Sequence, residues 1–176
     1  MLIRSLQIVL LSMKETKMNN NIVPLSQISN NGYFAVVLDK NSQKEMKLNA
    51  TFDVVNGDHI TLAYKPDNKK FVKLAPLVNK KVDAFVNQIR GNESIEAYWV
   101  KEMYLKDTYW SHKHKEYRSV YQKLKRLDKG PAHITISHKK NFKPGDANSM
   151  FKKPTYKENI PEQLQVSGKV KWIQYK

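Results

Sequence analysis

One short motif occurs twice in this chain, and its residue types suit proton transfer. Residues 59–62 read His-Ile-Thr-Leu, and residues 133–136 read His-Ile-Thr-Ile. Each copy combines an imidazole, which can accept or donate a proton near neutral pH, with a hydroxyl two residues later. The chain has only five histidines, so the repetition of the motif is improbable by chance. We therefore take the two copies as the first candidates for a functional site.

Alternation along a β-strand gives this spacing its meaning. Successive side chains of a strand point to opposite faces, so His59 and Thr61 share one face while Ile60 and Leu62 share the other. The second copy follows the same rule. If the two strands lie side by side, two imidazoles and two hydroxyls face one cleft. One histidine can then deprotonate a nucleophile, the other can protonate a leaving oxygen, and the hydroxyls can bind phosphate oxygens without a metal.

These paired motifs resemble those of the 2H phosphoesterase superfamily, named for two H-x-[S/T]-x motifs with aliphatic flanks. The apolar segment 32–38 and an intervening helix also match, and the resemblance covers about residues 30–140. It implies an α+β, bilobal fold in which two antiparallel-sheet lobes are related by pseudo-two-fold symmetry around a central cleft. It implies catalysis with no metal and no cofactor. The catalytic residues would be His59, Thr61, His133 and Thr135.

The resemblance also suggests a substrate. The small size of the chain and its segment GDHITLAYKPD, residues 57–67, are similar to the phage enzymes that destroy the cyclic oligonucleotide signals of CBASS defence. This implies a hydrolase that cleaves 3′–5′ linked cyclic di- or trinucleotides and evades host defence. Two alternatives stay open: an RNA-repair, 2′–5′ or 2′,3′-cyclic phosphodiesterase, and a non-catalytic RNA- or nucleotide-binding protein.

Five other residues are candidates for substrate binding. Tyr33, Tyr64 and Trp172 have rings on which a base can stack. Glu162 is a candidate for contact with a base edge, and Lys139 follows the second motif closely enough to neutralise a phosphate. The alternative interpretation is that the aromatic residues belong to the core and the charged ones to an ordinary surface.

The other histidines receive structural interpretations. His112 and His114 are close in sequence but have no nearby carboxylate or cysteine to complete a metal site, so we predict no metal there. His138 is predicted to point away from His133, because the two positions differ by an odd number of residues.

Composition narrows the function further. The net charge is +15, of which residues 101–176 carry +11, and this favours an anionic partner such as a nucleic acid, a nucleotide or a membrane surface. A lysine-rich solvated surface is the alternative. The chain contains no cysteine, which excludes disulfides and thiol nucleophiles. It also lacks the motif GxxxxGK[ST], which excludes a P-loop nucleotidase.

Turn residues and apolar periodicity predict a mixture of strands and helices without a regular strand–helix repeat, which is the α+β class. The helices are expected from Asp39 to about Phe52, over 74–90 and over 117–127. A loop is expected at 141–161. The strands are expected at 32–38, 59–64, 95–105, 133–138 and 163–175.

Residues 1–20 are interpreted as an N-terminal extension that is non-native or disordered, and 21–176 as one 2H-like domain with a basic insertion at about 107–129. The apolar run in residues 1–12 is shorter than a bilayer requires, and no signal-peptide cleavage pattern follows it. We therefore expect a cytoplasmic protein, in the host cytoplasm if it is viral.

Overall fold

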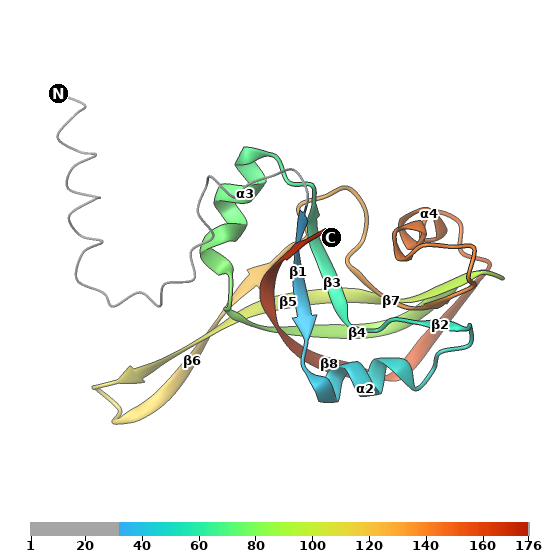
Figure 1. Cartoon of the computed structure of the whole chain (residues 1–176). Coiled ribbons are helices and arrows are strands. Elements are labelled where there is room, and N and C mark those ends of the chain that lie inside the picture. The colour runs from blue at the N-terminus through green and yellow to red at the C-terminus, as the bar shows by residue number, and fades with distance from the viewer. Residues whose placement is uncertain (1–31, 176) are drawn as a thin grey trace.

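The structure is a computed structural model that describes residues 32–175, and the predicted N-terminal extension lies outside them. Its fold is a mostly antiparallel sheet accompanied by helices, which confirms the predicted α+β class (Figure 1). The strands are β1 (Gly32–Leu38), β2 (Val54–Val55), β3 (His59–Tyr64), β4 (Lys81–Gly91), β5 (Ile95–Ser111), β6 (Glu116–Leu124), β7 (His133–His138) and β8 (Tyr156–Gln174). The helices are α2 (Lys40–Lys47), α3 (Asn68–Leu74) and α4 (Ala147–Met150), with short 3-10 turns at Ala75–Leu77 and Pro144–Asp146.

One hydrogen-bonded sheet contains all eight strands. Its order is β2-β7-β5-β4-β8-β1-β3, and β6 pairs with β5 beside this path. The sheet curves so that β3, at one end, approaches β7 near the other end. The backbone amides of Asn56 and Gly57 strengthen this approach by donating to the carbonyls of Ile136 and Thr135. Gly57 has φ +75°, a conformation that glycine adopts easily, and it turns the chain from β2 into β3.

The core lies inside this curved sheet. Alternate residues of β1, β3, β4 and β7 enter it, and Ile60, Leu62, Ile134 and Ile136 are all fully buried there. Burying such an aliphatic side chain contributes about 1.5–3 kcal/mol, so each motif strand is held firmly through its apolar face. The opposite face of each strand is left for the polar residues of the motif.

The prediction of a helix over 74–90 is wrong, because α3 ends at Leu74 and the segment after it forms a 3-10 turn followed by β4. Pro76 lies in the 3-10 turn, where it ends the helix. The apolar residues of this segment do not distinguish a helix from a strand, because β4 is a central strand between β5 and β8 and carries buried residues on both faces. Strand pairing on both sides therefore decided the conformation.

The predicted helix over 117–127 is also wrong. Residues 116–124 form β6, which pairs in register with the end of β5. Almost every side chain of β6 is exposed, so backbone pairing rather than burial fixes it as a strand. The β5–β6 hairpin extends away from the rest of the sheet (Figure 1). It occupies most of the predicted basic insertion.

Two other boundaries differ from the prediction. Helix α2 ends at Lys47 instead of near Phe52, and the predicted loop 141–161 contains α4 and the first residues of β8. Asp39 caps α2 by accepting a hydrogen bond from the Ser42 amide at 2.8 Å. None of the helices in residues 32–175 has the length and apolar composition needed to cross a membrane.

Candidate active site

The first motif presents its polar residues on the outer face of β3. Ile60 and Leu62 are fully buried in the core, while His59 and Thr61 are half-buried on the opposite face. This is the alternation that the sequence predicts for a strand. Val37 and Ala35 of β1 stand opposite His59 and Thr61 in the sheet register, so their side chains lie on the same face as the two polar residues.

The second motif lies on β7, where every residue is buried. His133 is 7% exposed, and the Thr135 hydroxyl donates a hydrogen bond to the carbonyl of Pro144 at 3.3 Å. The loop that contains Pro144 lies over this motif, whereas His59 is partly exposed within residues 32–175. The two motifs are therefore alike in sequence but differ in exposure.

Both motifs line one cavity of about 210 Å³. His59 and Thr61 enter it from β3, and His133 and Thr135 enter it from β7. The structure thus brings the four predicted catalytic residues together, although they are up to 76 positions apart in the chain. The other lining residues are Tyr33, Tyr64, Arg126, Pro144, Gly145, Asn148 and Tyr175.

A carboxylate orients His59. Its Nδ1 lies 2.7 Å from Oδ1 of Asp58, the preceding residue. The hydrogen bond from His59 holds the pKa of Asp58 below its ordinary value, so Asp58 is ionised at neutral pH. An ionised carboxylate at Nδ1 favours the tautomer with its proton on Nδ1. Nε2 is then the atom that can exchange protons with a substrate.

The surroundings of His133 have the opposite charge. Its Nδ1 lies 3.0 Å from the carbonyl oxygen of Pro131 and 3.2 Å from the guanidinium of Arg126. Burial lowers the pKa of His133 to about 4, the positive charges of Arg126 and His59 act in the same direction, and the Pro131 carbonyl partly opposes them. His133 is therefore a neutral ring at physiological pH.

Arg126 is a site residue that the sequence analysis missed. The amide of the next residue, Leu127, donates to the carbonyl of Leu62 at 2.8 Å, and this attaches the segment to β3. The side chain of Arg126 donates to the Pro131 carbonyl at 2.9 Å, but its buried Nε has no partner among the described residues. A cationic donor without a partner is suited to an anionic oxygen of a ligand. Arg126 lies within a run of basic residues, so nothing in the local sequence marked it as a site residue.

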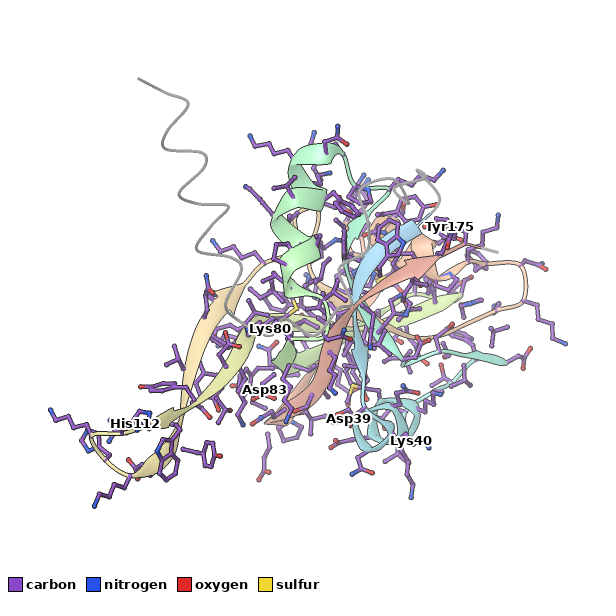
Figure 2. All side chains as sticks on the ribbon, turned by 60° about the vertical axis from the view of Figure 1, so that its left-hand side comes forward. Asp39, Lys40, Lys80, Asp83, His112 and Tyr175 are labelled. Carbon is purple, nitrogen blue, oxygen red and sulfur yellow. The ribbon has the colours of Figure 1, made fainter. Side chains whose placement is uncertain are left out.

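Three tyrosines form one wall of the cavity. Tyr33 packs against His59 with ring centroids 5.5 Å apart, and Tyr175 stacks on Tyr33 at 5.6 Å. Tyr64 meets Tyr175 edge-on at 5.7 Å. Tyr175, labelled in Figure 2, follows β8 and was not predicted. Burial, followed by the negative charge of Asp58, raises the pKa of Tyr33, so it remains a neutral hydroxyl near the histidines.

The other three predicted substrate-binding residues do not line this cavity. Trp172 packs against Phe34 and Phe71 at the core. Glu162 is exposed beside Pro161, where the pairing of β8 with β4 shifts. Lys139 lies over the ring of Phe52. His138 also lies outside the cavity, and its Nδ1 is 2.9 Å from the carbonyl of Lys139.

Within residues 32–175, no three histidine or acidic side chains are grouped as metal ligands would be. His112, labelled in Figure 2, follows β5 in the turn to β6. What the cavity offers instead is a pair of imidazoles in opposite electrostatic surroundings, two hydroxyls and one cation. Together these groups can remove one proton, supply another and bind an anionic oxygen between them.

The fold is similar to that of a solved structure. The chain is similar to a crystal structure of a fungal RNA kinase, with a TM-score of 0.55 and 14% sequence identity. The match covers 85% of this chain and 46% of the kinase chain, so this chain spans about half the length of its neighbour. At this identity the likeness shows the fold alone. No protein-family model and no curated protein matches the sequence.

Proposed function

We propose that this protein is a phosphodiesterase of the 2H type, in which two histidines transfer the protons and no metal ion is needed. One observation carries the proposal: the two His-Ile-Thr motifs, on separate strands, line the same cavity. This arrangement meets a need of the reaction, because a base and an acid must act on opposite sides of one phosphate. The rest of the cavity supplies donors to the oxygens of that phosphate.

The environments of the two histidines support different roles. His133 is neutral at physiological pH, so it is the proposed general base. Its shorter Nδ1 contact, to the Pro131 carbonyl, supports a proton on Nδ1 and a free electron pair on Nε2. His59 has the ionised Asp58 at its Nδ1, which holds the ring with Nε2 facing the substrate, so His59 is the proposed general acid.

The proposed reaction follows from these roles. Nε2 of His133 removes the proton from water or from a 2′-hydroxyl beside the phosphate. The oxygen then attacks phosphorus, the bond to the 5′-oxygen breaks, and Nε2 of His59 protonates that leaving oxygen. Arg126 and the Thr61 hydroxyl stabilise the charge on the non-bridging oxygens, and the Thr135 hydroxyl joins them when it exchanges its 3.3 Å hydrogen bond to the Pro144 carbonyl for one to the phosphate. Asn148, whose buried Oδ1 has no partner in the described residues, can accept from a sugar hydroxyl or a base.

The strand order supports a bilobal interpretation. From the middle of the sheet outward, one half reads β8-β1-β3 and the other reads β4-β5-β7. Each half ends in a motif strand, apart from the short β2, and the halves join through β4 and β8. We propose that these halves are the two lobes related by pseudo-two-fold symmetry.

The similar structure is that of a fungal RNA kinase. This likeness suggests that the proposed reaction belongs to RNA processing. A kinase must bind the phosphates of a nucleotide donor, and this chain lacks the GxxxxGK[ST] loop. We therefore propose RNA phosphodiester chemistry without phosphoryl transfer from a nucleotide. Cleavage of cyclic oligonucleotides, a phage counter-defence role and a cytoplasmic location stay predictions.

A product assay tests the proposal. The protein is incubated in EDTA with cyclic di- and trinucleotides, 2′–5′ oligoadenylate and an RNA that ends in a 2′,3′-cyclic phosphate. We expect at least one of these to be cleaved by the wild type and not by the H59A/H133A variant. The matched control is K44A/K73A, which removes two exposed side chains outside the cavity and should retain turnover. Cleavage by H59A/H133A at the wild-type rate would refute the proposed site, and no cleavage of any substrate would favour a binding protein.

A further inference from the structure

A row of directly opposed residues connects His59 to the β5–β6 hairpin. Residues that oppose each other in antiparallel strands have side chains on the same face of the sheet. The row crosses six strands in the order β3, β1, β8, β4, β5 and β6. Its members are His59, Val37, Lys169, Lys81, Lys106 and Tyr121. We call its three central members, Lys169, Lys81 and Lys106, the lysine row.

The positive charges of the lysine row are not paired with other side chains in residues 32–175. Within residues 32–175, none of its three lysines makes an ion pair or a side-chain hydrogen bond. They line a groove of about 430 Å³ that also contains Asp39 and Asp83, labelled in Figure 2. Both carboxylates already have partners: Asp39 caps α2, and Asp83 accepts from the Ser167 hydroxyl at 2.7 Å. These neutral donors leave both negative charges in place, but with Lys171 the groove holds four ammonium groups against two carboxylates, and this net positive charge favours an anion.

The hairpin continues this face with aromatic rings. Trp110 and Tyr117 oppose each other in the register, with ring centroids 5.0 Å apart. Alternation places both on the face of Lys106 and Tyr121, and the Lys106 ammonium lies 5.8 Å from the centre of the Tyr121 ring. Trp110, Tyr117 and Tyr121 are 43%, 74% and 53% exposed, which is unusual for large aromatic side chains.

Lysines followed by exposed aromatic rings fit one class of ligand. Single-stranded nucleic acids bind through phosphates on basic side chains and through bases stacked on aromatic rings. A duplex hides its bases within the stack, so it gains less from the rings. An acidic protein has no regular array of rings to place on Trp110 and Tyr117. The surface therefore favours a single-stranded polynucleotide.

The length of this surface favours a long linear ligand over a small cyclic one. Neighbouring strands lie about 4.8 Å apart, so the five steps from His59 to Tyr121 span about 24 Å. The catalytic cavity, of about 210 Å³, is smaller than the usual pocket for a drug-sized ligand of about 300–1,000 Å³. A compact cyclic dinucleotide in the cavity would leave the lysine row and the hairpin unoccupied.

We infer that the substrate is a linear single-stranded RNA, whose reacting phosphate lies in the cavity while the chain continues across the lysine row to the hairpin rings. This inference deepens the proposed function and rests on it. It assigns the β5–β6 hairpin a role in substrate binding, and it makes affinity depend on the length of the RNA.

Binding measurements test the inference independently of turnover. Fluorescence anisotropy compares a labelled 20-nucleotide oligouridylate with labelled diuridylate, with both measured in EDTA on an H133A background. We expect the long RNA to bind at least tenfold more tightly. The variant K81Q/K106Q/K169Q should lose at least tenfold in affinity for it. Losing three phosphate contacts should also make the slope of log affinity against log salt shallower by about two.

A matched control removes the same charge elsewhere. Lys44, Lys73 and Lys153 are exposed and line neither the cavity nor the groove, so K44Q/K73Q/K153Q should change affinity less than threefold. Equal losses in the two triple variants would mean general attraction by net charge and would overturn the inference. Equal affinities for the long and short RNA would overturn it as well.

The aromatic rings need a separate variant. W110A/Y117A/Y121A should weaken binding of the long RNA at least tenfold while leaving the salt slope unchanged, because stacking releases no counterions. Circular dichroism melts confirm that each variant is folded. Unchanged affinity, or equally tight binding of a 20-base-pair duplex, would overturn the assignment to single strands. Because these results do not depend on cleavage, failure of the proposed chemistry would appear only in the product assay.

Discussion

The two copies of the His-Ile-Thr motif lie in contrasting surroundings. On β3, His59 is partly exposed and has the carboxylate of Asp58 at its Nδ1. On β7, His133 is buried and has the guanidinium of Arg126 near its Nδ1. The aliphatic halves of the two motifs, in contrast, enter the same core and are equally buried. Identical residues thus have equivalent structural roles but unequal electrostatic ones.

Under the proposed function, this contrast would give a symmetrical motif the asymmetry that the reaction requires. Cleavage of a phosphodiester needs one group that accepts a proton and another that donates one. A repeated sequence alone gives both histidines the same ordinary behaviour. The neighbours Asp58 and Arg126 have opposite charges and therefore separate the two roles. The following predictions test this separation, beginning with the largest expected effect.

The largest effect is expected from removing either imidazole. H59A and H133A should each lower kcat/KM for an RNA substrate by about 10²–10⁴-fold, as loss of a general acid or base does. A substrate with a p-nitrophenolate leaving group, which needs no protonation, distinguishes the two. With it, H59A should recover most of the lost rate and H133A should not. Steady-state kinetics with both substrates measures the difference, and equal recovery in both variants would contradict the assigned roles.

The next prediction concerns the free energy of unfolding, which should depend on pH because His133 is harder to protonate in the folded protein than in the unfolded chain. Its pKa is about 4 when folded, against an ordinary value of about 6.5, so the unfolded chain binds more protons between these two pH values. Stability is therefore full above pH 6.5 and falls by about 3 kcal/mol as the pH drops to 4. Urea unfolding at a series of pH values measures this dependence. It should flatten in H133Q and persist in H59Q, and an unchanged slope in H133Q would exclude burial of a neutral ring.

The sequence predicted the motif strands well because their pattern is local. Alternation placed His59 and Thr61 opposite Ile60 and Leu62, and the structure agrees in both register and burial. It could not supply Arg126, because this residue reaches the cavity only through the pairing of Leu127 with β3. Asp58 was a missed signal, since it directly precedes the first histidine.

The errors in the fold have a common physical origin. Residues 81–91 and 116–124 become strands because both pair with β5, which lies between them in the chain. Their side-chain patterns do not show this: β4 carries buried residues on both faces and β6 is exposed on both. A pattern with no clear polar face carries little information about period. Backbone pairing then determines the structure.

A smaller effect is expected from Arg126. R126Q should lower kcat/KM by about 10–100-fold, because one charged donor to the phosphate is lost. It should also raise the pKa of His133, since a neighbouring positive charge disappears, and so move the acidic limb of the pH profile to higher pH.

R126K is the control for the Arg126 prediction, because it keeps the charge and loses the forked donor geometry. It should restore the position of the acidic limb and only part of the rate. A pH–rate profile for the three proteins makes the comparison. If the limb moved equally in R126Q and R126K, the charge of Arg126 would not be the cause.

The smallest effect is expected from the carboxylate beside His59. D58N removes the charge but can still accept a hydrogen bond from Nδ1, so the ring should stay oriented and kcat/KM should fall only about tenfold. Asp58 is exposed, and solvent screens its charge more than it screens a buried triad carboxylate. The loss should appear with the RNA substrate and be nearly absent with the p-nitrophenyl substrate, because Asp58 acts through the acid. An equal loss with both substrates would place Asp58 on the side of the base and reverse the contrast between the two motifs.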